Sequence, residues 1–466
     1  MKSGLKKAAV ALALMVSGAI CVNAQQVPAF RDGDRVVYIG DSITDGGHYH
    51  SYIWLFYATR FPYMDLRMYN GGIGGDTALS ILKRLEGDIF SKDPTYLTLT
   101  FGMNDTGYLE YKEDGAEEFG NRRFDESMES YSQIVKRLET LSGVRVAMIG
   151  GSPYDQEAAI QGLFGPLPGK NEVMQRISDR QRADAEARGW GFVDFNRPMF
   201  EMASKAREKD SLYTFTGGDR VHPDNAGHMV MAYLFLKAQG MAGNKVAEAG
   251  LDFRKGAVVK ADNCEITNVL KNRNEIRFDY LANALPCPLD TVAHGDGAPQ
   301  SKGAELVPFI EEMNEEILSV SGLSGRWKVL IDGEEIGQWS GKELAEGINL
   351  ATITWTPQYR QALKVMHLNE FRWEIEKQFR DLAWMQFDIL ADHGVVDIDT
   401  RHAVEVMDSL KKDNLWIQWH RPNFAKYMDR DVREARWQEM ENLADKMYEL
   451  NKPVIRKVVV KKADAR

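Results

Sequence analysis

The sequence predicts an α/β fold with a mostly parallel sheet, followed by a β-containing module and a long helical extension. Between residues 35 and 240, short apolar segments alternate with segments of helical periodicity, which is typical of a doubly wound sheet. Near residue 250 the pattern changes to Val- and Ile-rich segments. After residue 357 it becomes charged, rich in Trp and Met, and helical. A chain of 466 residues is long enough for about two to three domains.

Five short apolar segments are the predicted strands of the sheet, and five longer periodic segments are the predicted helices. The first helix must end before Pro62, which cannot continue it. The strands are expected at residues 35–39, 66–69, 96–101, 144–149 and 191–195, and the helices at residues 48–61, 77–89, 125–141, 171–188 and 223–239.

The second half of the chain is predicted to hold two further units. Residues 257–279 are expected to form two or three strands, and the Asp332-Gly333 pair marks the turn of a hairpin. Residues 357–450 have helical periodicity. We therefore expect a signal peptide (1–24), an α/β domain (25–245), a β-containing module (246–356) and a helical extension (357–466).

The first 24 residues have the pattern of an export signal. Three lysines flank the start of a short apolar run over residues 8–20, and Val22-Asn23-Ala24 ends in a small-residue cleavage pattern. The sequence thus predicts a periplasmic or extracellular protein. Cys21 would suit a lipid anchor, but the bulky Ile20 before it favours soluble export over anchoring.

Charge and hydropathy exclude two classes of partner. The net charge is −10, and the one dense basic run is the short stretch of residues 457–462, so no nucleic-acid partner is expected. After the signal, no apolar run approaches the roughly 18 residues that a membrane span needs.

Cys264 and Cys287 fit either a disulfide or two separate buried thiols. The sequence does not specify the oligomeric state.

Four short segments carry the residue types that acyl transfer to water requires. They are Gly40-Asp41-Ser42-Ile43, residues 70–77, Gly102-Met103-Asn104-Asp105 and Asp219-Arg220-Val221-His222. Ser42 directly follows the first predicted strand, at the sheet edge where ligands of open α/β sheets bind. Alone it would be interpreted as a helix cap, but with the other three segments it is the candidate nucleophile.

Gly75 and Asn104 follow the second and third predicted strands and are candidate oxyanion donors. The backbone N–H of Gly75 can approach a substrate oxygen closely because glycine has no side chain. The side-chain amide of Asn104 and the backbone N–H of Ser42 can donate to the same oxygen. The alternatives are a plain turn at Gly75 and an Asx turn at Asn104. A phosphate-binding loop at residues 71–75 is disfavoured because no Lys-Ser/Thr pair follows.

The candidate base is chosen by position, because three histidines have an aspartate three residues before them: His48, His222 and His402. His402 lies outside the α/β region, and His48 is too close along the chain to face Ser42 from an opposing loop. His222 follows the last predicted strand, so Asp219 can orient its imidazole toward Ser42.

Other polar residues near these segments are predicted to contact the substrate: Asp41, His48, Tyr108 and Tyr154. His228 is a rival base, but it lies inside the following helix pattern and is expected to be structural. His48 and His50 do not share a helix face, so no metal site is expected there, nor any cofactor.

The four segments resemble the blocks of the SGNH subgroup of the GDSL esterase/lipase family, over roughly residues 32–240. Ser42 falls on the family's nucleophile, Gly75 and Asn104 on its oxyanion positions, and residues 219–222 on its Asp-x-x-His block. The resemblance implies a flavodoxin-like three-layer α/β/α sandwich, hydrolysis without a metal, and a shallow, open active site. It implies nothing for the second half, which we expect to hold substrate and not to perform chemistry.

These observations predict a secreted serine esterase with a Ser42–His222–Asp219 triad. Export and the aromatic, polar loops after the third and fourth strands favour acetyl or other acyl esters on carbohydrate. The expected partner is therefore an acylated polysaccharide or small molecule. A lipase or thioesterase is the alternative, because Leu163 and Phe164 give one loop some apolar character. A non-catalytic carbohydrate-binding envelope protein is a further alternative, since eight of the ten tryptophans follow residue 320.

Overall fold

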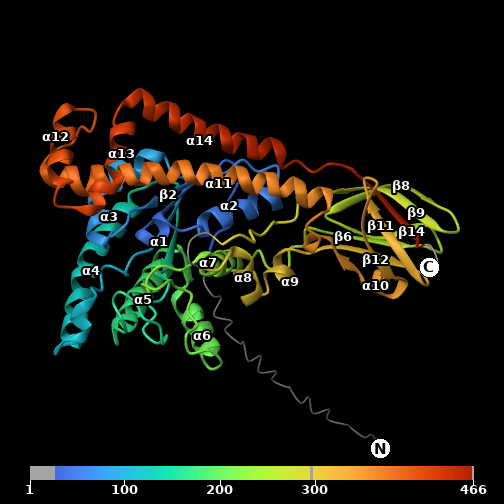
Figure 1. The fold of residues 1–466 in the computed structure, drawn as a ribbon, viewed down its shortest axis with the longest axis horizontal. Helices are drawn as coiled ribbons and strands as arrows, with labels where there is room; N and C mark the ends of the chain where they lie inside the picture. The colour runs from blue at the N-terminus through green and yellow to red at the C-terminus, as the bar shows by residue number, and fades with distance from the viewer. Residues whose placement is uncertain (1–26, 294–296, 464–466) are drawn as a thin grey trace, which may run out of the picture.

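The computed structural model describes residues 27–293 and 297–463. The predicted signal peptide and Cys21 lie outside these residues. The described chain runs from an α/β domain through a β-module to a helical extension that lies back over the α/β domain (Figure 1).

The α/β domain is built on five parallel strands in the order β2-β1-β3-β4-β5, which confirms the predicted fold class. The strands are β1 (Arg35–Gly40), β2 (Arg67–Gly72), β3 (Tyr96–Leu99), β4 (Arg145–Gly150) and β5 (Gly191–Asp194). In the register of β1, Tyr38 pairs with Asn70 of β2 on one side and with Thr98 of β3 on the other. β2 lies at one edge of this sheet.

Alternate residues of β1 enter two separate cores, one on each face of the sheet, which makes the three layers. Val36 and Tyr38 pack into one core together with side chains of α2 and α7, whereas Val37 and Ile39 pack into another together with side chains of α3 and α4. The helices are α1 (Ser42–Asp45), α2 (Tyr49–Arg60), α3 (Ala78–Arg84), α4 (Ala116–Glu139), α5 (Lys170–Arg188), α6 (Asn196–Arg207) and α7 (Asn225–Ala238).

Three details of this domain differ from the sequence prediction. The predicted helix over residues 77–89 ends at Arg84 and continues as a single π-helical turn, Leu85–Ile89. α4 begins at Ala116, because Gly115 takes the left-handed conformation before it and Glu117 and Glu118 suit a helical first turn. α6 was not predicted, because it starts directly after β5 without a linking loop.

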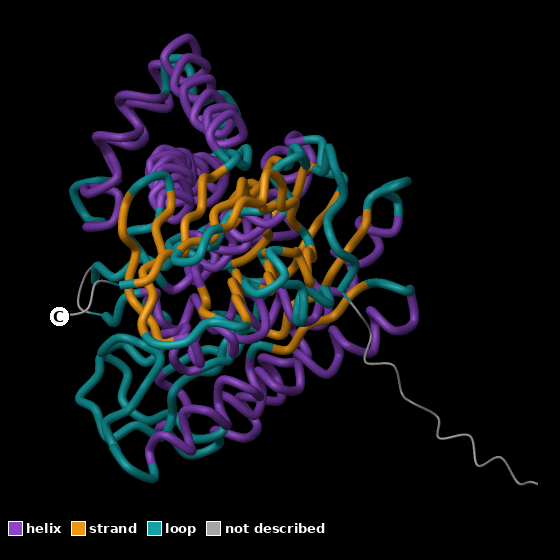
Figure 2. Tube along the Cα trace, turned by 90° about the vertical axis from the view of Figure 1, so that its right-hand side faces the viewer, coloured by secondary structure: helices purple, strands orange, loops and turns teal. Residues whose placement is uncertain are grey.

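The β-module contains two sheets that share one core, with strand orders β13-β10-β6-β7 and β12-β11-β14-β9-β8. Its strands are β6 (Ala247–Asp252), β7 (Ala257–Asp262), β8 (Cys264–Lys271), β9 (Glu275–Ala282), β10 (Glu316–Ser321), β11 (Arg326–Ile331), β12 (Glu334–Ser340) and β13 (Ile348–Asn349). Short helices α8 (Gln300–Leu306), α9 (Phe309–Met313) and α10 (Gly341–Glu346) connect them. The predicted strands over 257–279 and the hairpin around Asp332-Gly333 are confirmed, and Figure 2 views the molecule from this side.

The prediction that residues 357–466 form only a helical extension is wrong at its end. Residues Arg456–Lys462 form β14, which lies between β9 and β11 in the middle of the second sheet. Val458 and Val460 face the core, and their strand partners are about 130 to 185 residues earlier in the sequence, which is why a local pattern did not reveal them.

The helical extension consists of α11 (Pro357–Trp384), α12 (Arg401–Leu410), α13 (Leu415–Tyr427) and α14 (Arg430–Leu450). Thr356 caps α11 by accepting a hydrogen bond from the Tyr359 N–H, and Pro357 occupies its first turn. α11 and α14 lie side by side, and α11 runs over α2 and β2 (Figure 1). As a result, every residue of α2 is buried, although a helix on the outer face of a sheet normally exposes one side.

The structure also shows the state of the two cysteines and whether any described helix could cross a membrane. Cys264 and Cys287 are separate buried thiols and are not joined to each other. Among the described residues, no helix combines the length and the apolar character that crossing a membrane requires.

The placement of β14 generates a stability prediction. We expect Val460→Asp to lower the thermal unfolding midpoint strongly or to prevent soluble folding, because it buries an unpaired carboxylate in the core of the β-module. Val459→Asp, on the opposite and partly exposed face of the same strand, is the matched control and should cost much less. Equal effects of the two substitutions on thermal unfolding would contradict this placement of β14.

Candidate active site

Ser42 is held at the start of α1, just after the inner strand β1. Asp41 caps this helix by accepting a hydrogen bond from the Ile43 N–H at 2.9 Å. The strand can turn this tightly because Gly40 has no side chain: a Cβ there would lie 2.1 Å from Thr44 Oγ1. The turn leaves Ser42 on the wall of a cavity, at the carboxyl end of the sheet.

The structure brings Ser42, His222 and Asp219 into one hydrogen-bonded row. Ser42 Oγ lies 2.8 Å from His222 Nε2, and His222 Nδ1 lies 2.5 Å from Asp219 Oδ2. The other oxygen of Asp219 accepts hydrogen bonds from the backbone N–H groups of Val221 (2.9 Å) and His222 (3.0 Å), which fixes the carboxylate. With Nδ1 donating to Asp219, Nε2 is free to accept the serine proton.

The charges of this row are coupled. Burial alone would raise the pKa of Asp219, but the hydrogen bonds from His222 and from the Val221 and His222 amides outweigh burial and hold the pKa at about 2. Burial alone would lower the pKa of the His222 imidazole, but the hydrogen bond and the charge of Asp219 outweigh it and raise the pKa above its ordinary value. The arrangement therefore stabilises an imidazolium at His222.

Asn104 and Gly75 lie on the same cavity as Ser42. Asn104 Nδ2 donates to the backbone oxygen of Asp76 at 2.9 Å, and Tyr108 donates its hydroxyl proton to Asn104 Oδ1 at 2.9 Å. These two bonds fix which way the amide faces and leave its second N–H available. Gly75 has φ +87°, and nothing lies within 4 Å of where its Cβ would be, so its backbone is open to the cavity.

The cavity has a volume of about 710 Å³, and both halves of the chain line it. The α/β domain contributes Ser42, Asp45, Gly46, Gly74, Gly75, Asn104, Tyr108, Phe164, Val221 and His222, and the helical extension contributes Lys377, Asp381, Trp384, Trp416 and His420. The shallow, open site implied by the family resemblance is therefore not found, because α11 and α13 form a second wall.

This second wall is aromatic and carries a short row of ion pairs. Lys377 Nζ lies 3.2 Å from Asp45 and 2.6 Å from Asp381, so it joins α11 to the helix that carries Ser42. His420 Nδ1 lies 3.3 Å from the other oxygen of Asp381, and the ring of Trp384 lies against His420 at 5.4 Å. The sequence showed a Trp-rich helical pattern here, but no local signal places it at Ser42.

Of the four residues predicted to contact substrate, only Tyr108 lines the cavity. Asp41 is buried beneath the site, and burial raises its pKa to about 6. His48 pairs with Glu370 at 3.2 Å and stacks on Trp373. Tyr154 is fully buried and donates its hydroxyl proton to the Gly165 backbone oxygen. These three side chains fill structural positions.

His228, the rival base inside the α/β domain, and His50 are structural as well. His228 is buried inside α7, and burial together with the nearby His48 and His50 lowers its pKa well below the ordinary value. His50 is buried and bonded to the Thr44 backbone oxygen at 3.2 Å. In the part of the chain that the structure describes, no group of three or more His, Cys, Asp and Glu side chains could hold a metal ion.

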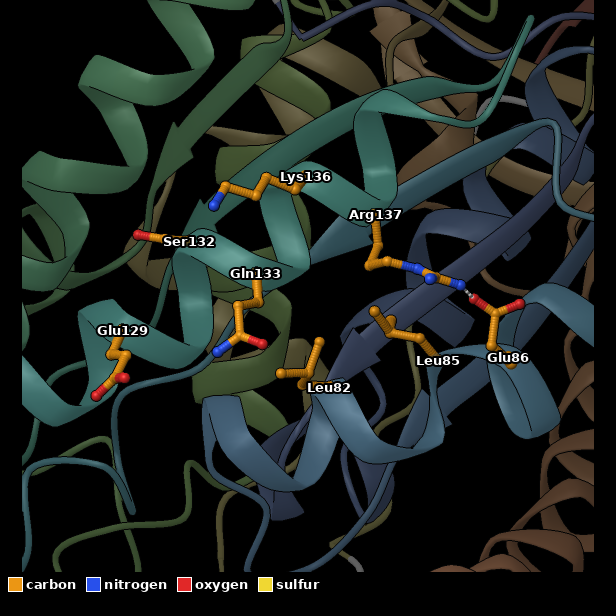
Figure 3. A pocket seen from close by; sticks show the side chains of 8 residues that line it. All are labelled: Leu82, Leu85, Glu86, Glu129, Ser132, Gln133, Lys136 and Arg137. Carbon is orange, nitrogen blue, oxygen red and sulfur yellow. Dashed lines mark hydrogen bonds and ion pairs between the residues drawn. The ribbon is translucent and has the colours of Figure 1, made fainter.

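A larger groove of about 900 Å³ lies between α3 and α4, away from Ser42 (Figure 3). Arg137 and Glu86 form an ion pair there. Its serine, Ser132, donates its hydroxyl proton to the Met128 backbone oxygen in its own helix, and no histidine lines the groove. The groove therefore holds no hydrogen-bonded serine–histidine pair, whereas the cavity at Ser42 does.

Two family models match the chain. Residues 38–230 match the GDSL-like lipase/acylhydrolase family, and residues 363–452 match the diltiazem deacetylase C-terminal helical domain. The first match contains all five strands of the parallel sheet except the first residues of β1, and the second begins within α11 and ends after α14.

The chain is also similar to solved and curated proteins. A solved structure of a gut microbial diltiazem-metabolizing enzyme is 51% identical, with a TM-score of 0.92, over 94% of this chain and all of that one. The acetylxylan esterase of Geobacillus stearothermophilus is 27% identical over 233 residues, which are 45% of this chain and 94% of that protein. A crystal structure of an acetylxylan esterase from the same organism has 22% identity and a TM-score of 0.36, over 45% of this chain and 95% of that one.

The coupling between His222 and Asp219 predicts how the His222 imidazole titrates. In an NMR titration, we expect its imidazole to titrate above the ordinary histidine value of roughly 6.5, and to titrate lower in Asp219→Asn. The His222 pKa should fall in this variant because the Asp219 charge favours the protonated imidazole. Without that charge, burial favours the neutral form. Asp45→Asn, which removes a weaker influence, is the control and should shift it less. A His222 titration unchanged in Asp219→Asn would contradict the coupling.

Proposed function

Because the chain belongs, through residues 38–230, to the GDSL-like lipase/acylhydrolase family and is a carboxylic ester hydrolase, we propose that it cleaves acetyl esters of compact, largely apolar alcohols. The observation that carries the proposal is the hydrogen-bonded row from Asp219 through His222 to Ser42, on the wall of a cavity with an aromatic opposite wall.

In the proposed mechanism, Ser42 Oγ attacks the ester carbonyl while His222 Nε2 accepts the serine proton. The carbonyl oxygen becomes an oxyanion, which accepts hydrogen bonds from the Ser42 and Gly75 backbone N–H groups and from Asn104 Nδ2. When the C–O bond to the alcohol breaks, His222 returns the proton to the leaving oxygen. Water then attacks the acyl-Ser42 ester with His222 again as base, which releases the carboxylic acid and the free serine. These steps use no metal or cofactor.

The role proposed for Asp219 is electrostatic. Its low pKa keeps the carboxylate ionised, so it can stabilise the imidazolium that forms when His222 accepts a proton. Asp219 need not carry a proton itself.

The cavity wall supports an apolar, compact alcohol group. Tyr108 and Phe164 stack at 4.5 Å on one side, and Trp384 and Trp416 lie on the side of the helical extension. A cavity of about 710 Å³ fits a small molecule, since typical ligand pockets are about 300–1,000 Å³. The 51% identical diltiazem-metabolizing enzyme and the match to a diltiazem deacetylase helical domain support an acetyl ester of a small molecule.

An acetylated carbohydrate is the second candidate substrate, and one observation favours it. Trp416 and Trp419 are 61% and 58% exposed on α13, and Trp416 also lines the cavity, so a sugar chain could stack beside the entrance. The 27% identical acetylxylan esterase supports the same idea for the α/β domain. The predicted export signal supports a periplasmic or extracellular site of action for either substrate.

The nucleophile can be tested directly. We expect Ser42→Ala to lower kcat for p-nitrophenyl acetate by at least about 10³-fold and to abolish labelling by a fluorophosphonate, with unfolding unchanged. Ser132→Ala, in the groove between α3 and α4, is the matched control and should keep both. Turnover by folded Ser42→Ala at a wild-type rate would refute the mechanism.

Substitution of the aromatic wall distinguishes the two candidate substrate classes. For the acetate of a bicyclic aromatic alcohol, we expect Trp384→Ala to lower kcat/KM by about tenfold, because burying an aromatic side chain stabilises by roughly 1.5–3 kcal/mol. For methyl acetate, Trp384→Ala should lower kcat/KM only slightly. Trp355 lies off the cavity, so Trp355→Ala should leave kcat/KM unchanged for both esters. A wild-type enzyme that prefers acetylated xylo-oligosaccharides, with Trp384→Ala unaffected on the aromatic acetate, would favour the carbohydrate instead.

A further inference from the structure

We propose that Glu376 and Arg380 of α11 are positioning residues, which hold the turn after β2 so that Gly75 and Asn104 can bind the oxyanion; this inference rests on the proposed function. It makes the helical extension part of the catalytic apparatus, beyond its contribution to the cavity wall. Hydrolysis of the smallest ester should then depend on α11, which differs from the expectation that the second half only holds substrate.

The turn after β2 lacks the support that an inner strand would have. β2 is at the edge of the parallel sheet, so its outer backbone groups have no neighbouring strand. Helix α11 supplies partners instead: Glu376 Oε1 accepts a hydrogen bond from the Asn70 N–H at 2.8 Å, and Arg380 Nε donates to the Gly72 backbone oxygen at 2.8 Å. Two charged side chains thus take the place of a neighbouring strand at the end of β2, where the turn of residues 73–77 begins.

Both side chains are almost fully buried and are themselves held by charges. Glu376 and Arg380 are 2% and 3% exposed. Arg372 donates to the second oxygen of Glu376 at 2.7 Å, and Arg380 donates to both oxygens of Asp88 at 2.9 and 2.7 Å. Burial alone would lower the pKa of Arg380, but Asp88 outweighs it and raises the pKa, so the guanidinium stays charged. Each of these charged side chains has an oppositely charged partner, and buried polar networks that are paired in this way rigidify the structure around them.

Asp88 connects Arg380 to a second buried arginine, which reaches the other side of the turn. Arg84 pairs with Asp88 and donates to Asp76 Oδ2 at 2.7 Å. Arg84 also donates to the backbone oxygens of Gly71 (2.8 Å) and Gly40 (3.2 Å), at the ends of β2 and β1. The network therefore holds the carboxyl ends of β1 and β2, which precede Ser42 and the turn of residues 73–77.

The far end of the network reaches the oxyanion donors. The backbone oxygen of Asp76 accepts the hydrogen bond from Asn104 Nδ2, and Gly75 directly precedes Asp76. Residues 73–77 belong to no helix or strand, so the position of the Gly75 amide depends on these anchors. A shift of the turn would move the Gly75 and Asn104 donors together, and one misplaced donor of this kind typically costs about 10²–10³ in kcat.

The test uses the full chain and p-nitrophenyl acetate, with rates expressed per active site titrated at Ser42. Arg380→Lys keeps a positive charge for Asp88 but cannot also donate to the Gly72 oxygen in the same way. We expect kcat to fall at least about tenfold, with KM changed less than about twofold, and the affinity for a trifluoromethyl ketone transition-state analogue to weaken in proportion to kcat. Glu376→Gln should shift kcat in the same direction by less, because its amide oxygen can still accept from Asn70.

Arg67→Lys is the matched control, since Arg67 joins the start of β2 to Glu441 and Asp445 of α14 but does not touch the turn. It should keep kcat per titrated site even if it lowers thermal stability. A wild-type kcat per titrated site in both Arg380→Lys and Glu376→Gln, or an equal loss in Arg67→Lys, would overturn the inference. Ser42→Ala separates the two proposals: if it retains activity, the proposed mechanism fails, whereas if it is inactive while Arg380→Lys turns over normally, only the role of α11 fails.

Discussion

The contact between α11 and the open edge of β2 is the interaction on which the rest of the site depends. The backbone groups of an edge strand need partners, and here buried carboxylate and guanidinium groups supply them. Such groups are costly to bury unless each is paired, and Arg372, Glu376, Arg380 and Asp88 meet this condition together. The helical extension therefore cannot be moved without leaving buried charges unpaired beside the catalytic turn.

The cavity divides its chemistry between the two halves of the chain. The α/β domain provides the Ser42–His222–Asp219 row and the polar donors: Ser42, Gly75 and Asn104 follow the ends of β1, β2 and β3, whereas Asp219 and His222 lie in the loop before α7. The helical extension provides an aromatic wall and the Lys377 bridge to Asp45. In the proposed function, the reacting groups thus come from the α/β domain, α11 holds the turn that carries two of them, and the choice of alcohol is a property of α11 and α13.

The sequence was sufficient for the parts that depend on local patterns. The five strands follow from short apolar runs, and three of the motifs lead to Ser42, Gly75 and Asn104 because each follows a strand end. The fourth motif leads to His222, which lies in the loop before α7 and contacts Ser42. It was insufficient where distant segments meet: Glu376 lies 306 residues from Asn70, and β14 joins a sheet whose other strands precede the helical extension. The sequence predicts substrate contacts for Asp41 and His48, which lie near Ser42 along the chain, and for Tyr154, which follows the fourth predicted strand. Their side chains instead cap a helix, pair with Glu370 and fill the core.

A crystal structure of the protein with a small alkyl phosphonate on Ser42 would test the account most directly, because the phosphonate oxygen occupies the place of the oxyanion. We expect this oxygen to lie within about 3 Å of the Ser42 N, Gly75 N and Asn104 Nδ2 atoms. We also expect that Arg380 still donates to the Gly72 oxygen and that the alkyl group faces Trp384 and Trp416. A phosphonate oxygen directed to solvent, or a turn that has moved away from Arg380, would contradict the account.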